Sequence, residues 1–321
     1  MLAVVANTPD PASPLSGMAV TEVAEPVAPE GWVKVQIKAA GLNHHDLWTL
    51  KGQATAAENL PIVLGSDGAG ITEDGREVII HAVVGDASKG DETLDPKRSL
   101  LSEIYDGTFA EYVVVPERNL ISKPNFLSFE EAACLPTAWL TAYRMLFTKS
   151  GLTKGQTVLI QGASGGVATA LIALANAGGF KVWVTSRDQS KLKYALEIGA
   201  HEVFESGSKL PGKVDAVMET VGEATWSHSM RSLKPGGRIV ICGATTGANP
   251  PADLNRLFFL QLEVIGSTMG TKQEFENLLN FLGETGIRPV IQKIYPFDEA
   301  HVAMQHLIDQ DVRGKIVLIP S

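Results

Sequence analysis

The chain has 321 residues, of which 45% are hydrophobic and 20% charged, as in a globular protein with room for two domains. Its formal net charge of −9 argues against a nucleic-acid-binding or membrane-surface role, because both need an exposed basic field. No signal-peptide pattern and no apolar run long enough to cross a bilayer is present, and Cys134 and Cys242 are isolated. We therefore expect a protein of the reducing cytoplasm.

The first third of the sequence is typical of a β-rich domain. Alternating apolar and polar residues predict a strand at 32–38, and apolar runs bounded by Gly or Pro predict strands at 77–81 and 109–115. The segment 86–102 is polar and aperiodic, which predicts a long loop. Two functions stay open for it: covering a site, or helping an oligomer to form.

The middle of the chain alternates short apolar runs with segments that carry apolar stripes at helical spacing. Five such runs predict strands at 157–160, 181–185, 214–218, 238–242 and 262–266. This alternation indicates a parallel sheet covered by helices on both faces, and therefore an α/β protein. After residue 270, two amphipathic helices and a last strand at 315–318 are expected.

A glycine-rich turn joins the first of these strands to the following helix. Glycines let the backbone approach a pyrophosphate, and the small Ala168 permits close packing of helix on strand. The free N–H groups and the dipole at the helix start favour a phosphate. Because strand, turn and helix occur in the required order, the motif predicts a dinucleotide site. The residues expected to contact the cofactor here are Gly162, Ala163, Ser164, Gly165, Gly166 and Val167.

The end of the second strand predicts which dinucleotide binds. An NAD site usually places Asp or Glu about 20 residues after the glycine motif. In this chain Ser186 and Arg187 follow the strand, and Lys191 lies one helical turn further on. A hydroxyl and two cations would bind the 2′-phosphate of NADP(H), which a carboxylate would repel. Asp188 is placed to cap the next helix, so we expect NADP(H) as the cofactor.

Beside this turn, further motifs occur in a specific order along the chain. They lie at 41–46, 64–70, 106–112, 233–238 and 314–318. Together with the glycine-rich turn they resemble the medium-chain dehydrogenase/reductase superfamily, which includes zinc alcohol dehydrogenases and zinc-free quinone reductases.

The resemblance implies a two-domain architecture. A GroES-like β-rich substrate domain is expected at 1–124 and 270–321, and a Rossmann dinucleotide-binding domain at 125–269. A cleft between them would hold the nicotinamide and the substrate. The resemblance also implies a homodimer joined through the sixth strand of each Rossmann sheet, here 262–267.

Two positions depart from the zinc-dependent members of the superfamily. The resemblance places Asn43 where those members carry a zinc-binding Cys, and Ser66 where they carry a zinc-binding His. Neutral amide and hydroxyl oxygens are poor zinc ligands. The loop 85–102, which corresponds to the structural-zinc lobe, contains no cysteine. We therefore expect no metal at either site.

The resemblance implies roles for other residues. His44 matches a position that often contacts the cofactor pyrophosphate, and His45 one that lines the substrate site. Asp46 is expected either to support this turn or to take part in catalysis. Thr141 matches a threonine that touches the nicotinamide, and Lys315 a basic position near the pyrophosphate.

Loops at the carboxyl ends of parallel strands are where such cofactors lie. The loops after the strands at 214–218 and 238–242 are expected to contribute Val221, Gly222, Gly243, Ala244 and Thr245. The remaining histidines are expected at the surface or as helix caps; they are His81, His201, His228, His301 and His306.

Without zinc, the oxidation of a simple alcohol loses the ion that stabilises its alkoxide. Quinones and α,β-unsaturated carbonyls accept a hydride more easily, because the charge delocalises onto oxygen and a neutral hydrogen-bond donor suffices. Asn43 and Ser66 are the expected donors, and His45 is an expected proton donor. The sequence thus predicts an NADPH-dependent reductase of small quinones or enones. An alcohol or aldehyde dehydrogenase on the same fold, or a non-catalytic NADPH-binding sensor, are the alternatives.

Overall fold

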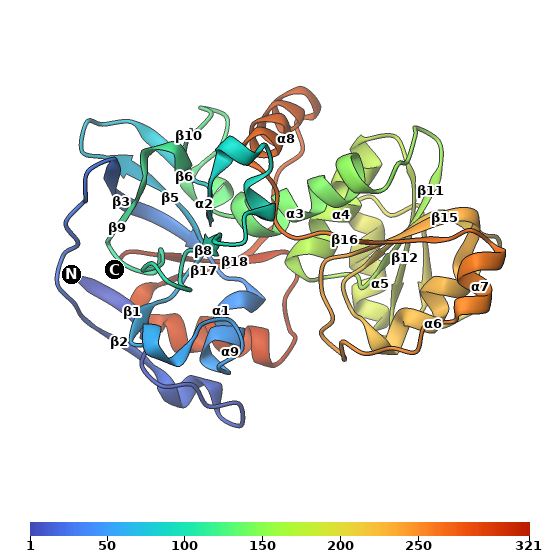
Figure 1. Ribbon diagram of the computed structural model, residues 1–321, viewed down its shortest axis with the longest axis horizontal. Helices are drawn as coiled ribbons and strands as arrows, with labels where there is room; N and C mark the ends of the chain where they lie inside the picture. The colour runs from blue at the N-terminus through green and yellow to red at the C-terminus, as the bar shows by residue number, and fades with distance from the viewer. The chain divides into compact units, whose positions relative to one another are not determined.

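The computed structural model describes the backbone of residues 1–321 and every side chain except that of Lys89. The chain divides into two compact units (Figure 1), each with its own hydrophobic core. Unit 1 consists of Met1–Ala138, Thr271–Gly283 and Arg288–Ser321, and unit 2 of Trp139–Gly270 and Glu284–Ile287. Within the described residues, no helix is both long and apolar enough to span a bilayer.

A mixed seven-stranded sheet forms the centre of unit 1. Its strands are β3 (Trp32–Gly41), β5 (Asp67–Thr72), β6 (Glu77–Ile80), β9 (Tyr112–Pro116), β10 (Leu120–Ser122), β17 (Ile291–Pro296) and β18 (Lys315–Ile319). The order is β10-β6-β5-β3-β18-β17, with β9 paired to β3. The last strand of the chain therefore lies inside the sheet, beside β3.

Smaller elements complete unit 1. The other strands are β1 (Leu2–Ala6), β2 (Met18–Glu22), β4 (Ile62–Val63), β7 (Val83–Val84) and β8 (Ser99–Leu100). The helices are α1 (His44–Leu50), α2 (Phe129–Ala132), α9 (Ala300–Ile308) and most of α8 (Lys272–Thr285). Helix α1 begins three residues after β3 ends, and its apolar residues join the core formed by the sheet and α9.

A six-stranded parallel sheet forms the centre of unit 2. Its strands are β11 (Thr157–Gln161), β12 (Lys181–Ser186), β13 (Glu202–Glu205), β14 (Val214–Glu219), β15 (Leu233–Ile241) and β16 (Glu263–Gly266). Its helices are α3 (Leu140–Tyr143), α4 (Gly166–Ala177), α5 (Gln189–Glu197), α6 (Glu223–Ser232) and α7 (Leu254–Phe259). The strand order β13-β12-β11-β14-β15-β16 is that of a doubly wound dinucleotide-binding sheet, which confirms the predicted α/β class.

The strands that the sequence did not predict include one at the edge of each large sheet. β13 and β17 contain mostly exposed or half-buried residues, so they lack the apolar run that identifies a buried strand. The strand predicted at 109–115 begins at Tyr112, because Ala110 makes an isolated bridge with Ala3 instead of joining β9. The predicted loop 86–102 contains two short helical turns, η3 (Ala87–Lys89) and η4 (Glu92–Leu94), as well as β8.

Candidate active site

Three neighbouring strands of unit 1 bring Asn43, Asp67 and Lys315 together. β18 and β5 both pair with β3, so the end of β3 lies between the first residues of the other two strands. The Lys315 ammonium donates to Leu42 O at 2.5 Å, to Asn43 Oδ1 at 2.7 Å and to Asp67 Oδ2 at 3.1 Å. All three side chains are buried, so the ion pair is shielded from solvent.

Asn43 and Ser66, the residues at the two zinc-ligand positions, are in contact. The Asn43 amide nitrogen donates to Gly41 O and to Ser66 Oγ, each at 3.3 Å. Ser66 Oγ also lies 3.2 Å from Thr137 Oγ1, on the π-helical turn η6 (Leu135–Trp139). Thr137 could not be predicted from the sequence, because its contact with Ser66 depends on the packing of distant segments.

Asp46 joins the backbones of the two segments that carry these residues. Its Oδ2 accepts the Asn43 N–H at 2.8 Å, and its Oδ1 accepts the Gly65 N–H at 3.1 Å. Burial raises the pKa of Asp46 to about 6, although nearby His45 and the Asn43 N–H oppose the increase. These contacts are those of a positioning residue, the first of the two roles expected for Asp46.

The ring of His45 contacts the loop that precedes β9. Its Nε2 lies 3.0 Å from Glu103 Oε1, and its Nδ1 lies 3.5 Å from Ser102 Oγ. Because a carboxylate only accepts, Nε2 carries a proton. Burial alone would raise the pKa of Glu103, but hydrogen bonds from His45 and the Leu100 N–H outweigh it and lower the pKa. A single acid in a polar loop has no sequence signal, which is why Glu103 was not predicted.

The glycine-rich turn of unit 2 has the backbone that its sequence requires. Gly162 has a φ of +94°, a conformation that favours glycine. Gly165 precedes α4 and provides no side-chain cap, and a Cβ added to it would meet nothing within 4 Å. The helix start is therefore open, with N–H groups that fit a phosphate.

The turn after β12 carries the residues that the sequence assigns to cofactor selection. Ser186 is buried at the end of the strand, and Arg187 beside it is exposed. Ser186 Oγ accepts the Asp188 N–H at 3.1 Å, and Asp188 Oδ1 accepts the Ser190 N–H at 2.7 Å. Asp188 therefore caps α5, as predicted, and Lys191 follows within the first turn of that helix.

A buried polar network supports the cofactor loops, and sequence reasoning missed it. Gln161 and Glu219 are fully buried at the carboxyl ends of β11 and β14. Glu219 Oε1 accepts the N–H groups of Val221 and Gly222 at 2.9 and 3.0 Å. Ser229 Oγ donates to Glu219 Oε2 at 2.6 Å and accepts from Gln161 at 2.9 Å. This network fixes the loop that follows β14.

The other predicted site residues lie on separate elements. His44 is exposed at the start of α1, and Thr141 is buried on α3. The loop after β15 carries Gly243, Ala244 and Thr245, the last two of which are exposed. The expectation that the remaining histidines lie at the surface or cap helices is wrong for His81 and His228, which are both buried.

The residues at the zinc positions do not fit zinc. Asn43 Oδ1 and Asp67 Oδ2 already accept hydrogen bonds from Lys315, whose charge would repel a second cation. Among the described side chains, no group of three or more His, Cys, Asp or Glu is arranged to hold a metal ion.

Comparisons with known proteins cover both units. Residues 29–125 match the alcohol dehydrogenase GroES-like domain, and residues 166–284 match the zinc-binding dehydrogenase family. A zinc-type alcohol dehydrogenase-like protein of Schizosaccharomyces pombe is 33% identical over 314 residues, which cover 90% of each chain. The quinone oxidoreductase of Homo sapiens is 28% identical over 318 residues, covering 93% of this chain and 92% of the relative.

The fold matches solved structures over its whole length. The crystal structure of an NAD-dependent alcohol dehydrogenase has a TM-score of 0.92 and 33% identity, and the match covers 100% of both chains. The GroES-like and Rossmann parts occur in the same order, and the relatives are oxidoreductases. The chain therefore belongs to the medium-chain dehydrogenase/reductase superfamily of oxidoreductases.

Proposed function

We propose that the protein is an NADPH-dependent, zinc-free reductase of small quinones or α,β-unsaturated carbonyls. The observation that carries this proposal is the hydrogen bond between Asn43 and Ser66, with Lys315 seated on the Asn43 oxygen. Hydrogen-bond donors, and not metal ligands, thus stand at the positions expected to face the substrate oxygen. The quinone oxidoreductase relative supports the same class of substrate.

Residues of unit 2 would hold the cofactor. The turn from Gly162 to Val167 would bind the pyrophosphate at the start of α4, and Ser186 and Arg187 would bind the 2′-phosphate. Lys191 adds a third group to the phosphate site. The chemistry that NADPH supplies when bound is a hydride. The exposed Arg187, in place of the acid of an NAD site, favours NADPH over the NADH used by the solved alcohol dehydrogenase.

Ser66 would donate to the substrate oxygen and stabilise the negative charge that develops there. Asn43 would orient this hydroxyl, because its two amide N–H groups donate to Gly41 O and Ser66 Oγ. One such preorganised donor contributes about 2.7–4 kcal/mol to the activation free energy. The same donor is less able to stabilise the alkoxide of a simple alcohol, which is why conjugated acceptors are proposed. The proton that completes the reduction is expected from His45; the nitrogen that carries it, Nε2, faces Glu103, so the ring would first have to leave that carboxylate.

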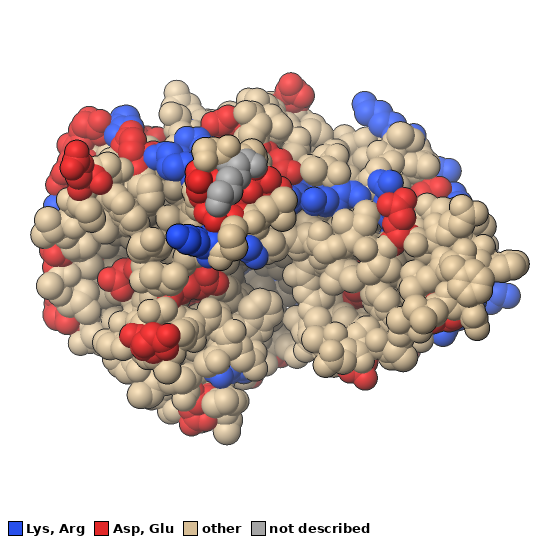
Figure 2. Space-filling model, in the orientation of Figure 1, with Lys and Arg blue, Asp and Glu red and all other residues tan. Residues whose placement is uncertain are grey.

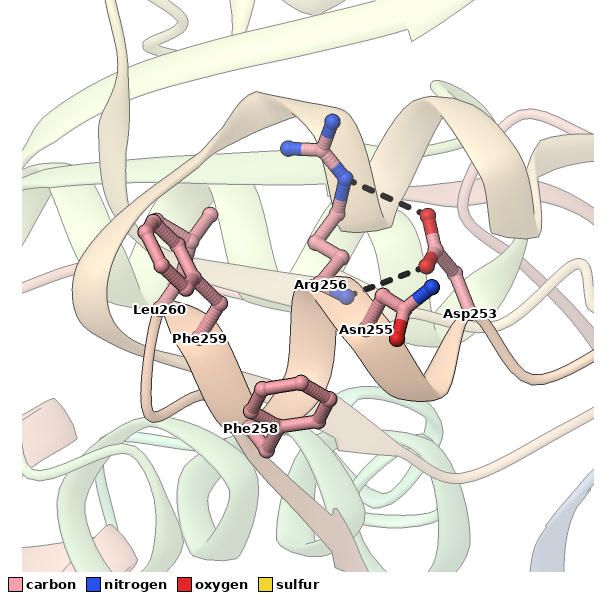
Figure 3. Close-up of a pocket in the computed structure, with 6 residues that line it drawn as sticks. All are labelled: Asp253, Asn255, Arg256, Phe258, Phe259 and Leu260. Carbon is pink, nitrogen blue, oxygen red and sulfur yellow. Dashed lines mark hydrogen bonds and ion pairs between the residues drawn. The ribbon is translucent and has the colours of Figure 1, made fainter.

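We also propose that two copies associate through the edge of the unit 2 sheet. β16 is an edge strand, and α7 beside it exposes 68% of Phe258 and 79% of Phe259. These rings and Arg256 line a hollow of about 510 Å³. Figure 3 shows the side chains that line it, with Arg256 in contact with Asp253. The surface over α7, at the right of Figure 2, is largely uncharged. A second copy would cover the rings and pair with the strand edge.

The test is a binding titration of metal-stripped protein with NADPH and NADH, followed by a hydride-acceptor screen. We expect NADPH to bind roughly tenfold tighter or more, which corresponds to about 1.4 kcal/mol. Quinones or enones should be reduced without added Zn²⁺ and with the same rate in chelator. Activity that requires zinc would contradict the proposal. Reduction of simple aldehydes alone would indicate the alcohol dehydrogenase class, and tight binding without turnover a sensor.

Substitution of Arg187 tests the cofactor choice directly. Arg187→Ala should weaken NADPH binding about tenfold and leave NADH binding unchanged, because only NADPH carries the 2′-phosphate. The matched control is Lys193→Ala, an exposed cation on α5 outside the phosphate turn. If Arg187→Ala lost the same factor of affinity for NADPH and for NADH, this arginine would not select NADPH.

A further inference from the structure

The ammonium of Lys315 has used all of its donors inside unit 1. An ammonium carries three N–H groups, and they bond Leu42 O, Asn43 Oδ1 and Asp67 Oδ2. The lysine is 2% exposed. A direct bond to a cofactor phosphate would have to break one of these contacts, and leaving a buried acceptor unpaired costs about 1–3 kcal/mol. The contacts therefore oppose the pyrophosphate role that the resemblance implies for Lys315.

Lys315 decides which way the Asn43 amide faces. An ammonium only donates, so the amide oxygen must face the lysine, and the reverse orientation would place the NH₂ group against the ammonium. With its oxygen fixed, the amide nitrogen faces Ser66 Oγ and Gly41 O, each at 3.3 Å. Ser66 Oγ thus accepts from Asn43, and its own hydrogen is directed toward Thr137 Oγ1, 3.2 Å away, or toward a ligand oxygen.

Strand pairing holds Lys315 and Asp67 next to Asn43, and so maintains this orientation of the amide. Lys315 is the first residue of β18 and Asp67 the first of β5, and both strands pair with the end of β3. Asp67 is fully buried, and its second carboxylate oxygen, Oδ1, has no hydrogen-bond partner among the described residues. The carboxylate therefore depends on Lys315 for its charge balance, which holds the ammonium next to Asn43.

We infer that Lys315 is a positioning residue that directs a series of hydrogen bonds, from its ammonium through the Asn43 amide to the Ser66 hydroxyl. The hydroxyl hydrogen at the end of this series is the one offered to the substrate oxygen. The identity of the substrate rests on the proposed function, whereas the orientation of the amide does not. The positive charge of Lys315 thus lies next to the Asn43 amide. Unlike a metal ion, it cannot be removed by a chelator.

The test needs a background that lacks the Asp67 carboxylate, since Lys315→Met alone would leave that charge buried without a partner and destabilise the fold. We would compare Asp67→Asn with Asp67→Asn/Lys315→Met, each with and without Asn43→Ala. The matched control is Lys293→Met, an exposed lysine on the neighbouring strand β17. Thermal unfolding of each variant ensures that only folded proteins are compared.

Loss of Lys315 should lower kcat for the quinone roughly ten- to hundredfold, and leave the Kd for NADPH within about twofold. In the Asn43→Ala background the same change should have no further effect, because the lysine acts through that amide. A Kd for NADPH that rises about tenfold, with kcat unchanged at saturating NADPH, would overturn the inference. An equal loss of kcat in both backgrounds would overturn it as well.

A second readout does not depend on activity. In ¹⁵N-labelled protein, the side-chain NH₂ resonances of Asn43 should move when Lys315 is replaced in the Asp67→Asn background, and stay in place in Lys293→Met. Resonances that do not move would refute the inference even if no substrate were found. If they move and the wild-type protein reduces no quinone or enone, the orientation stands and the proposed function fails.

Discussion

The carboxyl group of Asp46 is fully buried, and its two oxygens accept the backbone N–H groups of Asn43 and Gly65. Its pKa of about 6 lies above the ordinary value of 3.8, so the folded protein binds this proton more tightly than the unfolded chain. The stability contribution of Asp46 is therefore fully present below pH 3.8 and is lost as the pH rises through about 6. The loss is about 3 kcal/mol.

Urea unfolding at pH 4, 5, 6 and 7 checks this prediction. The unfolding free energy of Asp46→Asn should lack the decrease that the wild-type protein shows between pH 4 and 6. A parallel pH dependence in both proteins would mean that the Asp46 carboxyl does not titrate in this range.

Single residues also show where prediction from sequence reaches its limit. Asn43 and Ser66 could be named because each departs from a metal-ligand pattern at a known position in a motif. The bond from Lys315 to Asn43 could not, because 272 positions separate the two residues and only strand pairing joins them. Glu103 was missed for the same reason: its contact with His45 depends on how a loop folds back on α1.

At the scale of elements, Glu92 links the loop 85–102 to the start of α8. Its Oε1 accepts the Lys272 N–H at 2.7 Å and lies 3.3 Å from His81 Nε2. Burial alone would raise the pKa of Glu92, but these contacts outweigh it and lower the pKa to about 2. An acid with a lowered pKa stabilises the fold above its unfolded value of 4.5, and this contribution is lost as the pH falls toward 2.

Glu92→Gln should therefore destabilise the protein by about 3 kcal/mol at pH 7, because it removes the charge from a buried, hydrogen-bonded site. Amides at the start of α8 should lose hydrogen-exchange protection at the same time. The exposed Glu58→Gln is the matched control and should change neither measurement. Unchanged protection of α8 in Glu92→Gln would show that the loop does not anchor this helix.

The alternation of strands and helices in unit 2 was readable because buried parallel strands are short apolar runs. The edge strands β13 and β17 could not be predicted in this way. One side of an edge strand faces water, so its residues are mostly exposed or half-buried and form no apolar run. The polar ends of β11 and β14 were missed for a related reason. Gln161 and Glu219 look like solvent-facing residues in sequence, yet they satisfy each other through Ser229 inside the unit.

At the scale of the whole molecule, the exposed phenylalanines of α7 predict an oligomer. Phe258→Glu/Phe259→Glu should convert the proposed dimer into a monomer in light scattering after gel filtration, because two charges cannot be buried in an apolar interface. Leu196→Glu, on α5, is the matched control and should leave the dimer intact. A wild-type protein that is monomeric at micromolar concentration would refute this arrangement.

The position of β18 has a consequence for how the protein is made. Unit 2 is formed almost entirely by one continuous stretch, and its sheet can assemble while the ribosome is still adding later residues. Unit 1 cannot do the same, because β18, the strand beside β3, is synthesised only after the whole of unit 2. The contact between Lys315 and Asn43 therefore forms only after unit 2 has been synthesised. A nascent chain would have a folded cofactor-binding unit well before it had a functional active site.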